Sequence, residues 1–136
     1  MRENTSRNKV LVHAGNLFSY QNPVNLWQQV KKEIDIGNPL RLKFIGTVDE
    51  EIIKSISSAG LEPYTDYLGF LPYKNMLTEV CKADFLLVCA TEPRHVPGKL
   101  FEYLRAGKPI IAYGNNNQEV KMILEESNAG MMFGYD

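Results

Sequence analysis

The chain has 136 residues, which is enough for one domain with a substantial apolar core. Its hydrophobic fraction of 44% and charged fraction of 23% are those of an ordinary globular protein. Fifteen basic residues face sixteen acidic ones, so no overall positive field exists to attract nucleic acid or an anionic membrane.

Neither the cysteines nor the start of the chain suggests an exported protein. Cys81 and Cys89 lack the spacing of a metal site or redox motif, and we expect both to be small buried residues. Residues 1–8 are polar, unlike a signal peptide, and no apolar run approaches the ~20 residues of a membrane helix. We therefore expect a cytoplasmic protein with a polar linker remnant at residues 1–8 and one folded domain over residues 9–136, as a fragment of a longer chain.

The apolar pattern of the first third switches between strand and helix periodicity. Lys9–Ala14 is a short apolar run and predicts a buried strand. Pro23 suits the first turn of a helix, whose apolar residues continue at helical spacing to Ile34 before Gly37 ends it. Leu40–Ile45 predicts the second strand.

The middle of the chain continues this alternation. Asp49–Ala59 predicts a helix, Thr65–Leu68 a short strand, and Pro72–Lys82 another helix. Asp84–Cys89 is almost entirely apolar, as is typical of a central parallel strand that is covered on both faces.

The last third adds two strands and two helices. A helix is predicted at about Gly98–Arg105, followed by a strand at Ile110–Tyr113. Gln118–Ser127 predicts a fifth helix, and Ala129–Phe133 a sixth strand.

Alternating strands and helices predict an α/β domain with a doubly wound parallel sheet. Six strands suit the order 3-2-1-4-5-6, which reverses between strands 1 and 4. Ligands of such sheets bind beyond the carboxyl ends of the strands at this reversal. The two loops that follow strands 1 and 4, Gly15–Asn22 and Ala90–Gly98, are therefore the candidate binding segments.

The loop after strand 4 has the features of an anion site. Pro97 and Gly98 stand where a helix begins, and a helix start offers free backbone N–H groups to a phosphate. Gly98 permits close approach of a ligand, Arg94 and Lys99 add positive charge, and His95 adds a donor. The same residues are equally compatible with an ordinary turn and solvated side chains.

Other candidate residues lie nearby. Glu102, one turn into the helix, has a carboxylate that can accept hydrogen bonds from two ribose hydroxyls, although a surface position explains it equally well. The loop at Gly15 has neither the G-x-G-x-x-G pattern of a dinucleotide site nor the G-x-x-x-x-G-K-[ST] pattern of a phosphate-binding loop. His13 is expected to be a packed strand histidine. Tyr20, Tyr73 and Tyr103 are candidates for stacking on a base. The sequence contains no metal-ligand cluster, no nucleophilic triad and no pair of carboxylates at a spacing that suggests acid–base work.

Lys99–Ala112 (KLFEYLRAGKPIIA) resembles the signature segment of the nucleotide-sugar-dependent glycosyltransferases of group 1, which have the GT-B fold and are family 4-like. Four further segments resemble parts of that family in matching order, so that the resemblance spans about residues 9–134: Val10–Leu17, Leu68–Tyr73, Ala83–Leu87 and Asn128–Gly130.

The resemblance implies the C-terminal, donor-binding, Rossmann-like half of a two-domain enzyme. It implies metal-independent and retaining sugar transfer from a nucleotide-diphospho-sugar, without a cofactor, in the synthesis of bacterial surface polysaccharide or glycoconjugates. The acceptor would bind a separate N-terminal domain, and any membrane contact would be made through that half. The isolated domain is expected to be inactive.

The resemblance also implies roles for individual residues. Glu102 would hold the ribose, the loop Arg94–Gly98 would contact the diphosphate and the sugar, and the base would lie near Phe70–Leu71. No catalytic residue is assigned. The expected donor-binding residues are Gly15, Asn16, Phe70, Leu71, Arg94, His95, Val96, Pro97, Gly98, Lys99, Leu100 and Glu102.

The sequence departs from the family pattern at three positions. Arg94 stands where many members have a second glutamate, and Asn16 and Gln21 stand where many have an arginine and a lysine. Nucleotide-sugar 2-epimerases resemble the same half-sheet, but the Lys99–Ala112 string fits transferases better. A non-catalytic nucleotide-binding or interaction module is the alternative function. A signalling receiver domain is disfavoured because its acidic residues are missing.

Overall fold

A computed structural model describes residues 9–89, 99–113 and 130–133 of the chain. The described helices are α1 (Val24–Asp35), α2 (Glu50–Ser58), α3 (Tyr73–Lys82) and α4 (Lys99–Ala106), with short 3₁₀ turns at Ser19–Gln21 and Glu62–Tyr64. The described strands are β1 (Lys9–Ala14), β2 (Leu40–Ile45), β3 (Thr65–Gly69), β4 (Phe85–Cys89), β5 (Ile110–Tyr113) and β6 (Gly130–Phe133).

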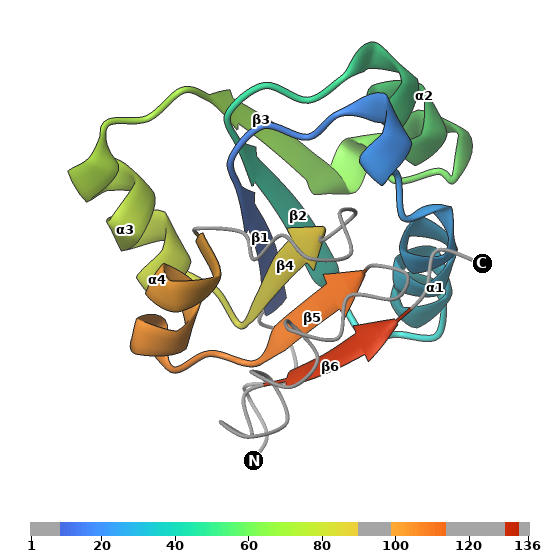
Figure 1. The fold of residues 1–136 in the computed structure, drawn as a ribbon. Coiled ribbons are helices and arrows are strands. Elements are labelled where there is room, and N and C mark those ends of the chain that lie inside the picture. Colours follow the sequence, from blue (N-terminus) through green and yellow to red (C-terminus); the bar gives the residue numbers. More distant parts are fainter. Residues whose placement is uncertain (1–8, 90–98, 114–129, 134–136) are drawn as a thin grey trace.

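The strands form one six-stranded sheet in the order β3-β2-β1-β4-β5-β6 (Figure 1), and every neighbouring pair is parallel. The predicted doubly wound α/β fold and its strand order are confirmed. β1 pairs with β2 over its whole length, from Lys9 to Ala14, but with β4 only at Leu11 and Val12. The two strands that flank the reversal therefore stop pairing before β1 reaches its carboxyl end.

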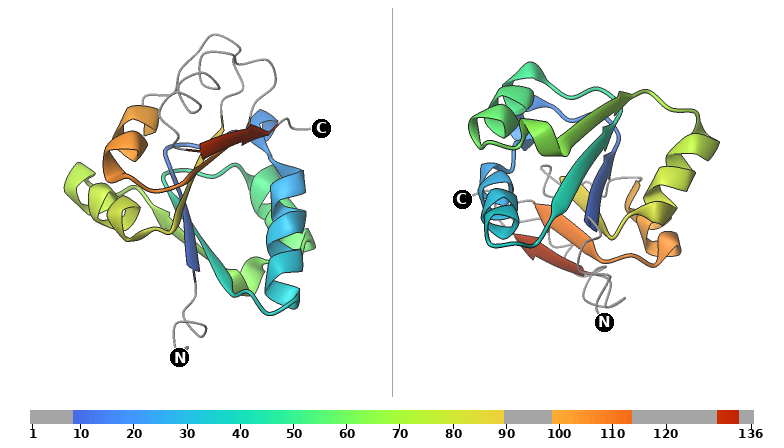
Figure 2. Two further views of the ribbon diagram at one scale, coloured as in Figure 1. Left: turned by 90° about the horizontal axis from the view of Figure 1, so that it is seen from below. Right: turned by 180° about the vertical axis from the view of Figure 1, so that it is seen from behind.

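Helices cover both faces of the sheet (Figure 2). α1 and α2 pack on one face, and α3 and α4 pack on the other. This arrangement follows from right-handed crossovers, because a sheet that grows first in one direction and then in the other must change the face that its helices cover.

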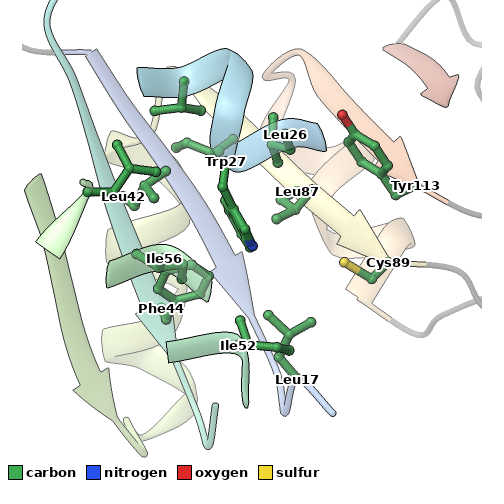
Figure 3. Close-up of a cluster of buried hydrophobic side chains, with 13 residues drawn as sticks. Leu17, Leu26, Trp27, Leu42, Phe44, Ile52, Ile56, Leu87, Cys89 and Tyr113 are labelled. Atoms are coloured by element: carbon green, nitrogen blue, oxygen red, sulfur yellow. The ribbon is translucent and has the colours of Figure 1, made fainter. Parts of the chain in front are cut away.

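Trp27 anchors the α1 face of the sheet (Figure 3). Its side chain is fully buried, and its ring meets Phe44 of β2 edge-on with centroids 5.8 Å apart. The indole Nε1 donates to Asn22 Oδ1 over 2.7 Å, so the polar edge of the ring is satisfied. The helical spacing of Leu26, Trp27 and Val30 explains why these residues of α1 are buried together.

Helix ends follow local capping chemistry. Asp49 precedes α2, and its side chain accepts a hydrogen bond from Glu51 N over 2.9 Å. Glu50 and Glu51 then lie in the first turn, where the helix dipole favours negative charge. Asp49 and Pro72 were predicted inside their helices and are instead the residues that immediately precede them.

Three other expectations need adjustment. β4 begins at Phe85 because Asp84 bonds back to β1, accepting from Val10 N at Oδ2 and donating from its own N–H to Val10 O. β3 extends one residue further, to Gly69. β6 is described over Gly130–Phe133, and the predicted first residue of this strand, Ala129, lies outside the described residues. Cys81 was predicted to be buried but is exposed, since α3 turns Met76 and Val80 inward instead. The predicted helix Gln118–Ser127 lies outside the described residues.

None of the helices in the described ranges is long and apolar enough to cross a membrane.

Candidate functional site

Three neighbouring strands end in glycines at the same edge of the sheet. Gly15, Gly46 and Gly69 close β1, β2 and β3 with positive φ angles of 112°, 107° and 70°. Gly46 is required by packing as well as by conformation, because a Cβ there would lie 2.8 Å from the carbonyl oxygen of Gly15. The absence of side chains lets the loops after β1 and β2 touch through their backbones.

Hydrogen bonds hold these three strand ends in register. Gly15 N donates to Ile45 O over 2.9 Å, and Gly46 N donates to Gly69 O over 2.7 Å. The exposed residue Asn16 accepts a hydrogen bond from Thr47 N at its Oδ1 over 3.1 Å. Asn16 therefore fixes the loop after β2 through its oxygen, which leaves its amide NH₂ as a donor at the surface of the site.

A cavity of about 320 Å³ opens at this edge. Its lining includes four of the residues that the sequence predicted to bind a donor, together with four that it did not. The eight lining residues are Gly15, Asn16, Ile45, Gly46, Phe70, Leu71, Tyr73 and Met76.

Aromatic surface dominates the β3 side of this cavity. Phe70 is 86% exposed and Tyr73 is 54% exposed, which are high values for large aromatic residues. Leu71 is half-buried against the core beneath. Exposed aromatic side chains are surfaces on which a flat ring can stack.

Of the lining residues that the sequence did not select as donor-binding, Gly46 carried a recognisable signal. It is a glycine directly after a predicted strand, next to the strand that carries Gly15. Ile45 and Met76 carried none, because buried apolar residues of this kind occur throughout the chain.

The second half of the predicted site is described only in part. Lys99, Leu100 and Glu102 belong to the first turn of α4, and their backbone is described but their side chains are not. The other predicted residues of the preceding loop lie outside the described ranges: Arg94, His95, Val96, Pro97 and Gly98.

α4 is nevertheless tied to the edge that carries the cavity. Ala14 N, at the end of β1, donates a hydrogen bond of 2.9 Å to the hydroxyl of Tyr103 in α4. Tyr103 is 1% exposed, so the interpretation that it stacks on a base is wrong. Among the other candidates for stacking, Tyr73 lines the cavity and the side chain of Tyr20 is outside the description.

Gln21, at the position where many family members have a lysine, makes structural contacts. Its Nε2 donates to Cys89 O at the end of β4 over 3.4 Å, and its Oε1 accepts from Phe18 N over 2.9 Å. The side chain thus joins the loop after β1 to the end of β4. Both the oxygen and the NH₂ group of its amide are therefore used inside the chain.

No charged side chain lines the cavity in the described part of the chain. Nor do the described residues contain a group of three or more His, Cys, Asp or Glu that is able to hold a metal ion. A larger cavity of about 750 Å³ lies at the opposite, amino end of the strands, between α1 and the starts of β1, β2 and β4. Because ligands of doubly wound sheets bind at the carboxyl edge, we assign the site to the smaller cavity.

His13 is buried in β1, two residues before Gly15, and is only 7% exposed. Its ring lies beside Phe44 with centroids 6.4 Å apart, and its Nδ1 forms no hydrogen bond of good geometry with any described residue. Burial lowers the pKa of His13 from 6.5 to about 4, an effect that the nearby backbone of Gly15 offsets only in part. The prediction of a packed strand histidine is confirmed.

This burial predicts a pH-dependent stability. Between pH 6.5 and pH 4 the unfolded chain binds a proton at His13 that the folded chain does not, so stability falls as the pH falls. The two pKa values correspond to a loss of about 2 kcal/mol between pH 8 and pH 5. Urea unfolding across this range measures it. His13→Leu should flatten the slope, and a slope that survives in this variant would contradict the assignment.

Comparisons with known proteins agree with this architecture. The family model described as glycosyl transferases group 1 matches residues 2–133. No curated protein sequence matches the chain significantly.

Solved structures share the fold at low sequence identity. WaaG, a glycosyltransferase involved in lipopolysaccharide biosynthesis, aligns with a TM-score of 0.69 at 13% identity, over 95% of this chain and 34% of its own. HepE of Anabaena, solved with UDP and glucose, aligns with a TM-score of 0.62 at 20% identity, over 86% of this chain and 33% of its own.

A third structure is itself a single domain. The C-terminal domain of the group 1 glycosyltransferase LpcC of Francisella tularensis aligns with a TM-score of 0.68 at 13% identity, over 93% of this chain and 68% of that one. The present chain spans about a third of the length of WaaG and of HepE. The match of the family model over nearly the whole chain, on the half-GT-B fold described above, shows that the chain belongs to the group 1 glycosyltransferases.

Proposed function

We propose that this domain binds the nucleotide-diphospho-sugar donor of a metal-independent, retaining glycosyltransferase. The observation that carries the proposal is the cavity at the carboxyl edge of β1, β2 and β3, which Gly15, Asn16, Phe70 and Leu71 line together. These residues come from segments more than fifty positions apart, and the sequence had selected each of them for donor binding. Further support comes from two proteins of the same fold that were solved with UDP, HepE and GtfA.

Each part of the donor has a place in this proposal. The base lies against Phe70 and Leu71, and the backbone at Gly15 and the amide of Asn16 face the phosphates. The helix start at Lys99 supplies further N–H groups to the diphosphate, because the first residues of a helix have free donors. Glu102 accepts hydrogen bonds from the ribose hydroxyls.

The acceptor binds a separate N-terminal domain, and the isolated domain transfers no sugar because the reaction needs a cleft between two domains. The product is a bacterial surface polysaccharide or glycoconjugate, in keeping with the lipopolysaccharide role stated for WaaG. The enzyme works in the cytoplasm without a metal or cofactor, and only the acceptor half touches a membrane.

An NMR titration of the labelled chain with UDP tests donor binding. We expect amide shifts at Gly15–Asn16, Phe70–Leu71 and Lys99–Glu102, because these backbone segments would surround the ligand. Inorganic phosphate at the same ionic strength is the control and should reproduce the shifts at Gly15–Asn16 and Lys99–Glu102 but not those at Phe70–Leu71. Shifts confined to the lining of the opposite cavity, such as Val30 and Leu40, would sink the assignment. No shift with UDP, GDP or ADP would favour the non-catalytic interaction module.

A further inference from the structure

The end of β1 carries a backbone donor that the sheet itself does not pair. Lys9 N and Gly15 N both donate toward β2, to Pro39 O and Ile45 O. Because backbone groups alternate in direction along a strand, the N–H of Ala14 faces the other neighbour, β4. The pairing of β1 with β4 ends at Val12, so Ala14 lies beyond the last paired residue.

The hydroxyl of Tyr103 fills the place that a β4 carbonyl would otherwise occupy. It accepts the hydrogen bond from Ala14 N over 2.9 Å, in a buried position. The ring is 1% exposed and packs among Val12, Ala14 and Val88, which belong to the two strands that separate. Tyr103 therefore stands at the point where the sheet reverses and the ligand crevice of such folds opens.

The same residue fixes the position of α4. Tyr103 is the fifth residue of this helix, and its contact with Ala14 joins segments 89 positions apart. Ala14 immediately precedes Gly15 and Asn16, which line the cavity, while the residues before Tyr103 form the helix start. One hydrogen bond thus joins the segment before Gly15 and Asn16 to the helix that begins at Lys99.

We propose that Tyr103 is a positioning residue of the donor site, which rests on the proposed function of that site. Its hydroxyl holds the start of α4 and the Gly15–Asn16 loop at the separation that a nucleoside diphosphate spans. Tyr103 touches no ligand itself, because it is buried beneath the cavity edge. Its effect on binding is exerted through the two backbone segments that it joins.

Tyr103→Phe tests the proposal with the smallest possible change, since only the hydroxyl is removed. In the free variant, the Ala14 amide should exchange with solvent faster, and the amides of Gly15, Asn16 and Lys99 should shift. UDP affinity should fall about fivefold, the factor expected for one neutral hydrogen bond. The control is Ile56→Val, a buried substitution in α2 on the opposite face of the sheet, which lowers stability by packing alone. It should leave UDP affinity unchanged.

The outcomes separate this proposal from the proposed function. If the wild type binds UDP and Tyr103→Phe binds it equally well, or if Ile56→Val weakens binding to the same extent, Tyr103 has no positioning role. If the wild type binds no nucleotide, the proposed function fails. The role of Tyr103 is then tested on the ligand-free proteins. If the amide shifts caused by Tyr103→Phe stay within α4 and do not reach Gly15 and Asn16, that role is overturned.

Discussion

Gly46→Ala is expected to destabilise the domain by about 3 kcal/mol or more, a large part of the total stability of a domain of this size. Two costs add together. The φ angle of 107° is one that residues with a Cβ rarely adopt, and the new Cβ would lie 2.8 Å from Gly15 O and 3.2 Å from Asn16 Oδ1. The backbone of Gly15 has to move, so UDP affinity should fall along with stability.

Gly37→Ala provides a matched control for the first of these costs. Gly37 has a φ angle of 104°, almost that of Gly46, but nothing lies within 4 Å of the Cβ position. Its substitution should cost only about 1–2 kcal/mol of backbone strain and leave UDP binding unchanged. Urea unfolding of both variants, with equal m-values, measures the difference. Equal losses in the two variants would mean that the loops after β1 and β2 are not in contact.

The order of the strands could be predicted from the sequence because the signals for it are local. Apolar runs such as Leu40–Ile45 alternate with helical spacing, and the rules for crossover connections then leave few topologies. The same local signals predict the ends of some helices and strands one residue away from where the structure has them. Asp84 was predicted inside a strand because the run after it is apolar, but its carboxylate turns back to accept from Val10 N.

The details of the site depend on contacts between distant parts of the chain. Gly46 and Gly15 are 31 positions apart, and nothing in either loop indicates that their backbones meet. Tyr103 is an aromatic residue in a helix, a type found both in cores and at ligands. Its burial and its bond to Ala14, which only the fold reveals, distinguish the two roles. The resemblance to a family selected residues that line a cavity at one edge of the sheet, whereas the packing that shapes this edge required the fold.

Glu102→Ala is expected to weaken UDP binding by about 1.5–3 kcal/mol, or roughly 10- to 150-fold, because a charged hydrogen-bond acceptor is lost. Since the hydroxyl of Tyr103 ties α4 to β1, the fold should survive. Glu51→Ala is the matched control, as this exposed glutamate lies in the first turn of α2. Isothermal titration calorimetry measures the affinities, and circular dichroism checks that the variants are folded.

A second ligand shows which part of the nucleotide Glu102 recognises. If its carboxylate accepts from the ribose hydroxyls, the wild type should bind UDP more tightly than 2′-deoxy-UDP. Removing the carboxylate should abolish that preference, because the two changes delete the same interaction and their effects cannot add. A general loss of phosphate affinity would instead weaken both nucleotides equally and preserve the preference. Unchanged discrimination in Glu102→Ala would therefore place the ribose away from α4, even if the overall affinity falls.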